Sequence, residues 1–118
     1  MLPTIKEIHA EMLQQPEYWR IFLMNFVDDF RRSKNLSLIA EPICPANHRL
    51  DALVAAVVDS LCAESSLAPP EWTETIAPLS KPWFVAGLEN LKAIALVESP
   101  APFRVRNIFV LNNFLSRA

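Results

Sequence analysis

Apolar residues recur every three to four positions in two long stretches of the chain, and this spacing predicts two amphipathic helices. In the first stretch, residues 17–34, the apolar positions are Trp19, Phe22, Leu23, Phe26, Val27 and Phe30. In the second stretch, residues 48–64, they are Leu50, Leu53, Val54, Val57, Val58 and Leu61. The i, i+3, i+4 spacing places each set on one side of a helix. These two faces are expected to close over the C-terminal half.

Polar residues and prolines mark where the N-terminal helices should begin and end. Thr4 followed by Glu7 has the pattern of a capping box, which predicts a first helix ending just before Pro16. Asn35 is expected to end the second helix in the left-handed conformation, and Asn47 is expected to cap the third. Residues 36–46 contain two prolines and are predicted to form an extended connector.

The C-terminal third is broken into shorter pieces. Gly87 should mark a turn before a helix over residues 88–98, and Ser99 is expected to cap the next turn, ahead of Pro100. Residues 105–111 read as either a short strand or an extended segment crossing the core. Residues 112–118 are predicted to form a brief terminal helix.

The composition favours a helical fold. The chain has 118 residues, 52% of them hydrophobic, with one glycine and ten prolines. Scarce glycine and abundant proline suit sharply ended helices better than glycine-containing hairpins. We therefore predict an all-α fold, a compact single-domain helical bundle over residues 1–118. It would have Pro-rich connectors and one short extended segment near residues 105–111.

Several function classes are disfavoured by the residue types present. One glycine leaves no Gly-rich phosphate loop, dinucleotide fingerprint or glycine-flanked nucleophilic serine. The two histidines lie in separate segments, and Cys44 and Cys62 match no metal or redox spacing. Asp28 and Asp29 should form ion pairs with the arginines that follow them. The sequence thus favours a non-enzyme without metal or cofactor, although a catalytic group assembled only in space stays open.

The expected location is the cytoplasm. No apolar run approaches the roughly 18–20 residues that a membrane helix needs. Glu7 and Glu11 interrupt the stretch that would form the apolar part of a signal peptide. We therefore expect no membrane association.

Five residues are candidates for binding a ligand or partner. Trp72 and Trp83 lie in Pro-rich connectors, where an aromatic side chain can serve recognition or pack in the core. Arg104 and Arg106 could contact phosphate or a base, more convincingly if Lys81 shared their face. Two arginines in a chain of net charge −2 are few for a nucleic-acid site. They are expected instead to pair with acidic residues of the middle segment.

Charge is distributed unevenly along the chain. Residues 35–78 carry Arg49 against six acidic residues, for a net charge of −5. Residues 79–118 carry five basic residues against two acidic ones, for a net charge of +3. This asymmetry is the main electrostatic indication of a binding face.

The C-terminal half resembles a recurring pattern in uncharacterised small helical bacterial proteins. The matching elements are Trp72, Pro82-Trp83-Phe84, the Leu-rich residues 88–96, Glu98-Ser99-Pro100, Phe103-Arg104, Arg106, Ile108-Phe109-Val110 and Arg117-Ala118. In similar proteins the pattern sometimes follows a helix-turn-helix domain, which implies a regulatory or partner-binding role in a toxin–antitoxin-like setting. Here the N-terminal part is too short for such a domain, so the resemblance does not extend DNA binding to this chain. It implies no catalytic residues.

The sequence leaves three functions open. The leading hypothesis is a non-enzymatic protein-interaction or regulatory module that binds a protein partner, or forms a homodimer through leftover apolar surface. The second is a small-molecule-binding protein or weak enzyme with a pocket near Trp72, Trp83 and Arg104. The third, which is less favoured, is a nucleic-acid-binding accessory protein that uses Arg104 and Arg106.

Overall fold

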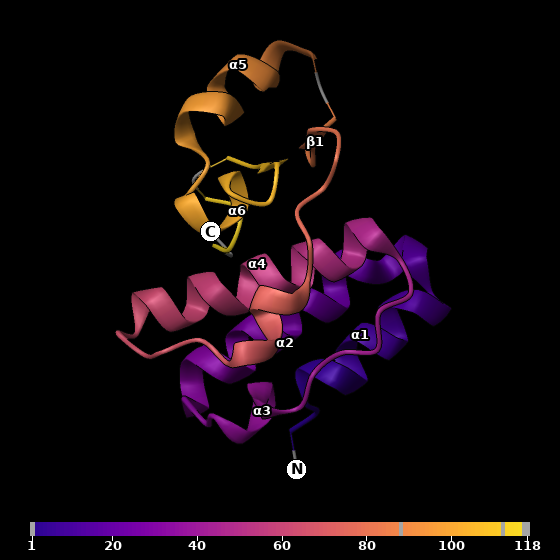
Figure 1. The fold of residues 1–118 in the computed structure, drawn as a ribbon, viewed down its shortest axis with the longest axis vertical. Helices are drawn as coiled ribbons and strands as arrows, with labels where there is room; N and C mark the ends of the chain where they lie inside the picture. The colour runs from indigo at the N-terminus through magenta and orange to yellow at the C-terminus, as the bar shows by residue number, and fades with distance from the viewer. Residues whose placement is uncertain (1, 88, 112, 117–118) are drawn as a thin grey trace.

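Three long helices form the larger part of the molecule. The computed structural model describes residues 2–87, 89–111 and 113–116, and this part of the chain is mostly helical. Helix α1 (Ile5–Gln14) contacts α2 (Trp19–Ser33) and α4 (His48–Glu64), and α2 in turn contacts α4 (Figure 1). A 3₁₀ turn, η1 (Pro16–Tyr18), leads into α2. The helices predicted in the N-terminal half, up to residue 64, are thereby confirmed.

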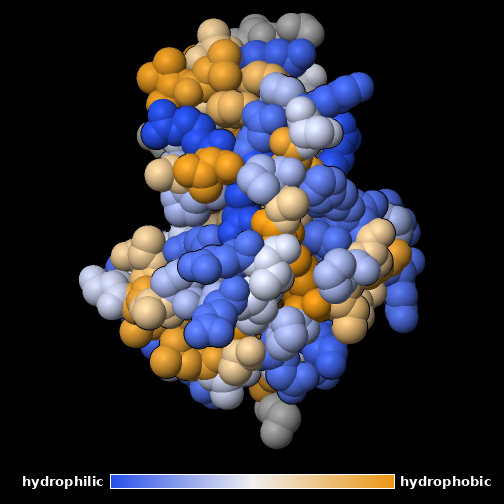
Figure 2. All heavy atoms as spheres, viewed as in Figure 1, coloured by the Kyte–Doolittle hydropathy of each residue, from blue (hydrophilic) through white to orange (hydrophobic). Residues whose placement is uncertain are grey.

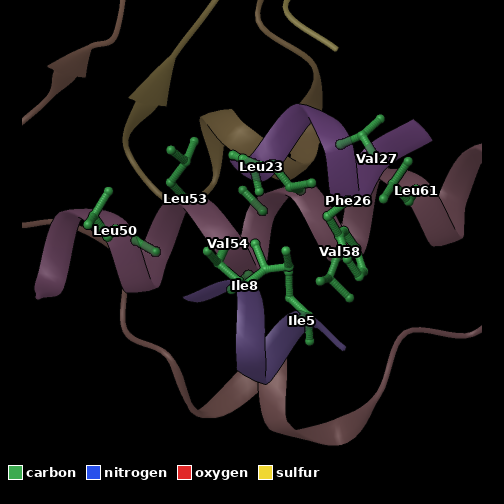
Figure 3. Close-up of a cluster of buried hydrophobic side chains, with 14 of the residues drawn as sticks. Ile5, Ile8, Leu23, Phe26, Val27, Leu50, Leu53, Val54, Val58 and Leu61 are labelled. Atoms are coloured by element: carbon green, nitrogen blue, oxygen red, sulfur yellow. The ribbon is translucent and has the colours of Figure 1, made fainter. Parts of the chain in front are cut away.

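Helix α4 lies at the centre of the core. Residues 52–58 are fully buried, so this helix is enclosed on more than the single face that its periodicity predicts. A helix that is apolar around most of its circumference is stable only when other elements cover it. Figure 3 shows Ile5 and Ile8 of α1 and Phe26 of α2 gathered against Val54 and Val58 of α4.

The predicted caps at the starts of α1 and α4 are confirmed. Thr4 Oγ1 accepts a hydrogen bond from Glu7 N at 3.3 Å, and Thr4 N donates to Glu7 Oε1 at 2.9 Å. Asn47 Oδ1 accepts from Leu50 N at 3.1 Å. These bonds satisfy backbone N–H groups that have no partner inside a helix.

The end of α2 differs from the prediction. Lys34, not Asn35, takes the left-handed conformation, with φ at 51°. The Asn35 side chain is engaged elsewhere, because Oδ1 accepts from the backbone N and the hydroxyl of Ser37. These bonds precede a short helix, α3 (Ser37–Ala40), so the connector over residues 36–46 is not extended throughout.

The C-terminal part is organised around a small parallel strand pair. Strand β1 (Trp83–Phe84) pairs with β2 (Ile108–Phe109), so the extended segment predicted near residues 105–111 is present as β2. Helices α5 (Glu89–Glu98) and α6 (Ala101–Arg104) lie in the crossover between these strands. Parallel strands require a long connection of this kind. Helix α5 lies at the end of the molecule opposite α1 and α3 (Figure 1).

Ser99 does not cap α6, although the sequence predicted that it would. Pro100 holds the N-cap position, and Ser99 Oγ instead accepts from Val110 N at 2.8 Å. The same hydroxyl lies 2.5 Å from Ala95 O and 2.9 Å from Val110 O. It therefore joins the end of α5 to the residue that follows β2.

The terminal helix predicted over residues 112–118 is not seen in the part of this segment that the structure describes. Residues 113–115 form a turn. Residues 112, 117 and 118 lie outside the described residues.

A buried polar pair joins α1 to α4. His9 Nε2 lies 2.6 Å from Asp51 Oδ1, and both residues are buried. Asp51 Oδ2 also accepts from Ala46 N at 3.0 Å, which fixes the chain just before α4. Buried polar groups are tolerated when they are paired in this way.

Replacing Asp51→Ala should lower the free energy of unfolding by about 3 kcal/mol or more, because it leaves the buried His9 imidazole and the part-buried backbone N–H of Ala46 without their hydrogen-bond partner. Urea denaturation followed by circular dichroism measures this change. The control is Glu41→Ala, which removes an exposed pair with Lys6 and should cost less than about 1 kcal/mol. Equal losses in the two variants would contradict the structural role of Asp51.

The two thiols should differ in reactivity. Cys44 is exposed and Cys62 is buried, and burial, assisted by the nearby Asp59 charge, raises the pKa of the Cys62 thiol. Because the thiolate is the reactive form, a disulfide reagent at neutral pH should modify Cys44 quickly and Cys62 only after denaturation. Mass spectrometry of the labelled peptides measures this order, and rapid labelling of Cys62 in the native protein would contradict it.

Candidate functional site

Trp72 belongs to the core. It is 8% exposed, and its indole N–H donates to Ile39 O at 2.8 Å. This bond attaches the 3₁₀ helix η2 (Glu71–Thr75) to α3. Trp72 therefore takes the packing role that the sequence left open beside recognition.

Arg106 is buried and bound by the chain itself. Its guanidinium donates to Asp59 Oδ2 at 2.8 Å, to Ile76 O at 2.8 Å and to Thr73 O at 2.9 Å. The expected pairing with the acidic middle segment is thus confirmed for Arg106. Its Nε is buried without a hydrogen-bond partner, as is the second carboxylate oxygen of Asp59.

The remaining three candidates lie nearer the surface. Trp83 is half-buried, with its ring 6.3 Å from that of Trp19 and 5.4 Å from the guanidinium carbon of Arg49. Lys81 is exposed two residues before Trp83, and Arg104 is exposed at the end of α6. The structure therefore places Lys81 and Trp83 close together and puts Trp72 in the core. None of the cavities described below is lined by Trp72, Trp83 or Arg104.

A basic pocket opens at the start of α4. It has a volume of about 220 Å³ and is lined by His48, Arg49, Leu79, Ser80 and Lys81. Three of these side chains can carry positive charge, and a fourth has a hydroxyl group. We call these five residues the basic pocket.

Hydrogen bonds hold the two sides of the basic pocket together. His48 Nε2 lies 3.2 Å from Ala77 O, which joins the first residue of α4 to the loop before β1. Leu79 N donates to Arg106 O at 3.0 Å, and Leu79 O accepts from the side chain of Asn107 at 3.1 Å. The loop that carries Ser80 and Lys81 is therefore fixed at several points.

A second surface feature is the outward side of α5. Ile94 is 45% exposed, Leu96 48% and Val97 79%, whereas Ala95 between them is buried. Val105, just beyond α6, is 68% exposed. We call Ile94, Leu96, Val97 and Val105 the α5 surface. Figure 2 shows apolar atoms gathered over this end of the molecule.

Two larger cavities are open hollows along α2. One, of about 470 Å³, is lined by Pro3, Ile8, Glu11, Phe22, Asn25, Asp28, Asp29 and Arg32. In it, Arg32 donates to Asp29 at 2.7 Å, as expected for an ion-paired helix edge. The other, of about 290 Å³, is lined by Arg20, Ile21, Met24, Phe114 and Ser116.

The described residues show neither a metal cluster nor a membrane span. No group of three or more His, Cys, Asp and Glu side chains among them is arranged to hold a metal ion. Within the same residues, every helix is too short or too polar to cross a bilayer.

Sequence reasoning identified Lys81 but missed His48 and Arg49. Arg49 is the only lysine or arginine of the acidic segment 35–78, and it is the second residue after the cap of a long helix. That position was the available signal, because basic residues are unusual where a helix dipole is positive. The partner loop could not be assigned from spacing, since about 30 residues separate it from the first turn of α4.

Comparisons with known proteins identify no relatives. No protein-family model matches the sequence, and no significant match to a curated protein or a solved structure is found. The resemblance of residues 72–118 to small helical bacterial proteins stays a prediction.

The contrast between Arg106 and Arg104 gives a direct test of their roles. Arg106→Ala breaks a buried ion pair and should lower the free energy of unfolding by about 3–5 kcal/mol. Arg104→Ala, at an exposed position, should change it by less than about 0.5 kcal/mol. Chemical denaturation of both variants measures the difference. Similar stabilities would show that the contacts of Arg106 do not hold the fold together.

Proposed function

We propose that the chain is a non-enzymatic protein-interaction module that works in the cytoplasm. The proposed scaffold is a helical bundle of α1, α2 and α4, with α5 presented at one end. The observation that carries the proposal is the α5 surface, where four large apolar side chains are exposed. Contiguous apolar surface on a small protein is a common mark of a partner site.

The sequence of α5 supports this reading. Its last two turns, Lys92–Glu98, are apolar except at their ends, so apolar residues point both toward the protein and away from it. A helix that is apolar on opposite sides normally has both sides covered. In this structure the inward side contains the buried Ala95, and the outward side exposes Val97. A partner would cover the outward side of α5.

Charge indicates what kind of partner fits. Arg104 is exposed immediately beside Val105, and residues 79–118 carry a net charge of +3. An acidic segment with an apolar stripe would match both features, as amphipathic helices do in helix-in-groove recognition. A second copy of this chain would bring the same positive charge to the interface. We therefore propose an acidic amphipathic helix of a partner protein.

The other two hypotheses have weaker support. Nucleic-acid contact needed Arg104 and Arg106 together, but the guanidinium of Arg106 is bound to Asp59 and two carbonyls. A pocket shared by Trp72, Trp83 and Arg104 lacks support because Trp72 packs in the core. For the cytoplasm, the support is that both cysteines are unpaired thiols, as is usual in reducing compartments.

Binding of a designed helical peptide tests the proposal. A fluorescent 18-residue peptide with a leucine stripe and glutamate elsewhere should bind, as measured by anisotropy. Val97→Asp should weaken binding about tenfold or more, because it places a like charge in the contact. Arg104→Gln should weaken it less and reduce its dependence on salt.

The controls separate docking from non-specific adhesion and from self-association. The same peptide with lysine in place of glutamate should bind more weakly, and Glu41→Gln, far from α5, should leave binding unchanged. Equal binding of both peptides would overturn the proposal. So would a dimer in sedimentation equilibrium that Val97→Asp converts to a monomer, because a second copy would then occupy the surface.

A further inference from the structure

We propose that the basic pocket at the start of α4 is a binding site for a small phosphate-type oxyanion. This site is separate from the α5 surface and does not depend on the interaction proposed for it. The charges of the lining side chains contrast with the net charge of the chain. The chain carries a net charge of −2, yet His48, Arg49 and Lys81 converge on one cavity.

The lining of the basic pocket suits an anion. Arg49 and Lys81 supply charged N–H donors, Ser80 supplies a hydroxyl, and none of the described lining residues is acidic. Charge-assisted hydrogen bonds to phosphate oxygens are stronger than those between neutral groups. His48 and Arg49 also begin α4, where the helix dipole adds a partial positive charge.

The donors are held in place before any ligand arrives. Arg49 lies over the ring of Trp83 at 5.4 Å, which limits the orientations of its guanidinium. The loop bearing Lys81 is fixed by the bonds of Leu79 to residues 106 and 107 and by Trp83 N, which donates to Asn107 O at 3.0 Å. Two neighbouring prolines, Pro78 and Pro82, further restrict it. A preorganised site loses less entropy on binding.

The size of the cavity limits the ligand. About 220 Å³ is below the usual range of roughly 300–1,000 Å³ for sites that enclose a drug-sized molecule. It has room for a single tetrahedral anion, with its lining side chains largely exposed around the rim. The shared ligand chemistry is therefore a dianionic phosphate, either as the free ion or as the terminal group of a small phosphate monoester.

Nuclear magnetic resonance titration of the full chain tests this inference. Inorganic phosphate, glycerol phosphate and acetate are added separately at constant ionic strength. Both phosphates should give saturable shifts of the backbone amides of residues 48, 49, 80 and 81 and of the indole N–H of Trp83. Tighter binding of glycerol phosphate identifies a monoester ligand, and tighter binding of inorganic phosphate identifies the free ion.

Charge-removing variants make the test specific. Lys81→Gln should weaken phosphate binding about fivefold or more, and adding Arg49→Gln should bring the loss to at least about tenfold. Lys6→Gln removes one positive charge outside the basic pocket and should leave the affinity unchanged. Because Lys81 is exposed, its variant should fold normally even if Arg49→Gln disturbs the packing of Trp83.

Three results would overturn the inference. The first is a linear, unsaturated response to phosphate. The second is an equal response to acetate, which would indicate only a diffuse attraction of anions. The third is an equal loss of affinity in Lys6→Gln and Lys81→Gln, since net charge would then explain the binding without a defined site.

Discussion

The guanidinium of Arg106 is the interaction on which the arrangement of the C-terminal part depends. It binds a carboxylate of α4 and two carbonyls of the η2 region, so one side chain connects three segments that are distant in sequence. A buried charge is costly unless its donors are satisfied, and here three protein acceptors bind the two terminal NH2 groups, while Nε alone lacks a partner. The backbone carbonyl oxygen of Arg106 accepts a hydrogen bond from Leu79 N, which fixes the loop that carries Ser80 and Lys81. The basic pocket is thus positioned in part by the residue that makes this buried contact.

The core beneath this contact is built differently. Helix α4 is covered on most sides by apolar groups of α1, α2, α6 and η2, and these contacts have no directional preference. Directional contacts are added at a few points, such as His9 with Asp51 and Trp72 with Ile39. In such a core, apolar burial supplies most of the stabilisation of the folded state. The polar pairs select one arrangement among similar packings.

The sequence predicted the helices well because their signals are local. The capping box of α1, the Asn47 cap of α4, the apolar period of α2 and the break at Pro16 act over four or five residues. The errors came where a polar side chain has an alternative hydrogen-bond partner. Asn35 bonds to Ser37 instead of ending α2, and Ser99 binds Val110 instead of capping α6. Strand β1 escaped prediction because its partner is 25 positions away. The basic pocket joins such distant segments, so spacing identified only Lys81.

The strand pair has a consequence for how this protein could diversify. Backbone bonds from Trp83 N to Asn107 O and from Val85 N to Phe109 O close the base of the segment that contains α5 and α6. Once the base of a loop is closed, changes in its length alter the closure entropy only slightly. The length of the segment that contains α5 can therefore change while the strand pair at its base is kept.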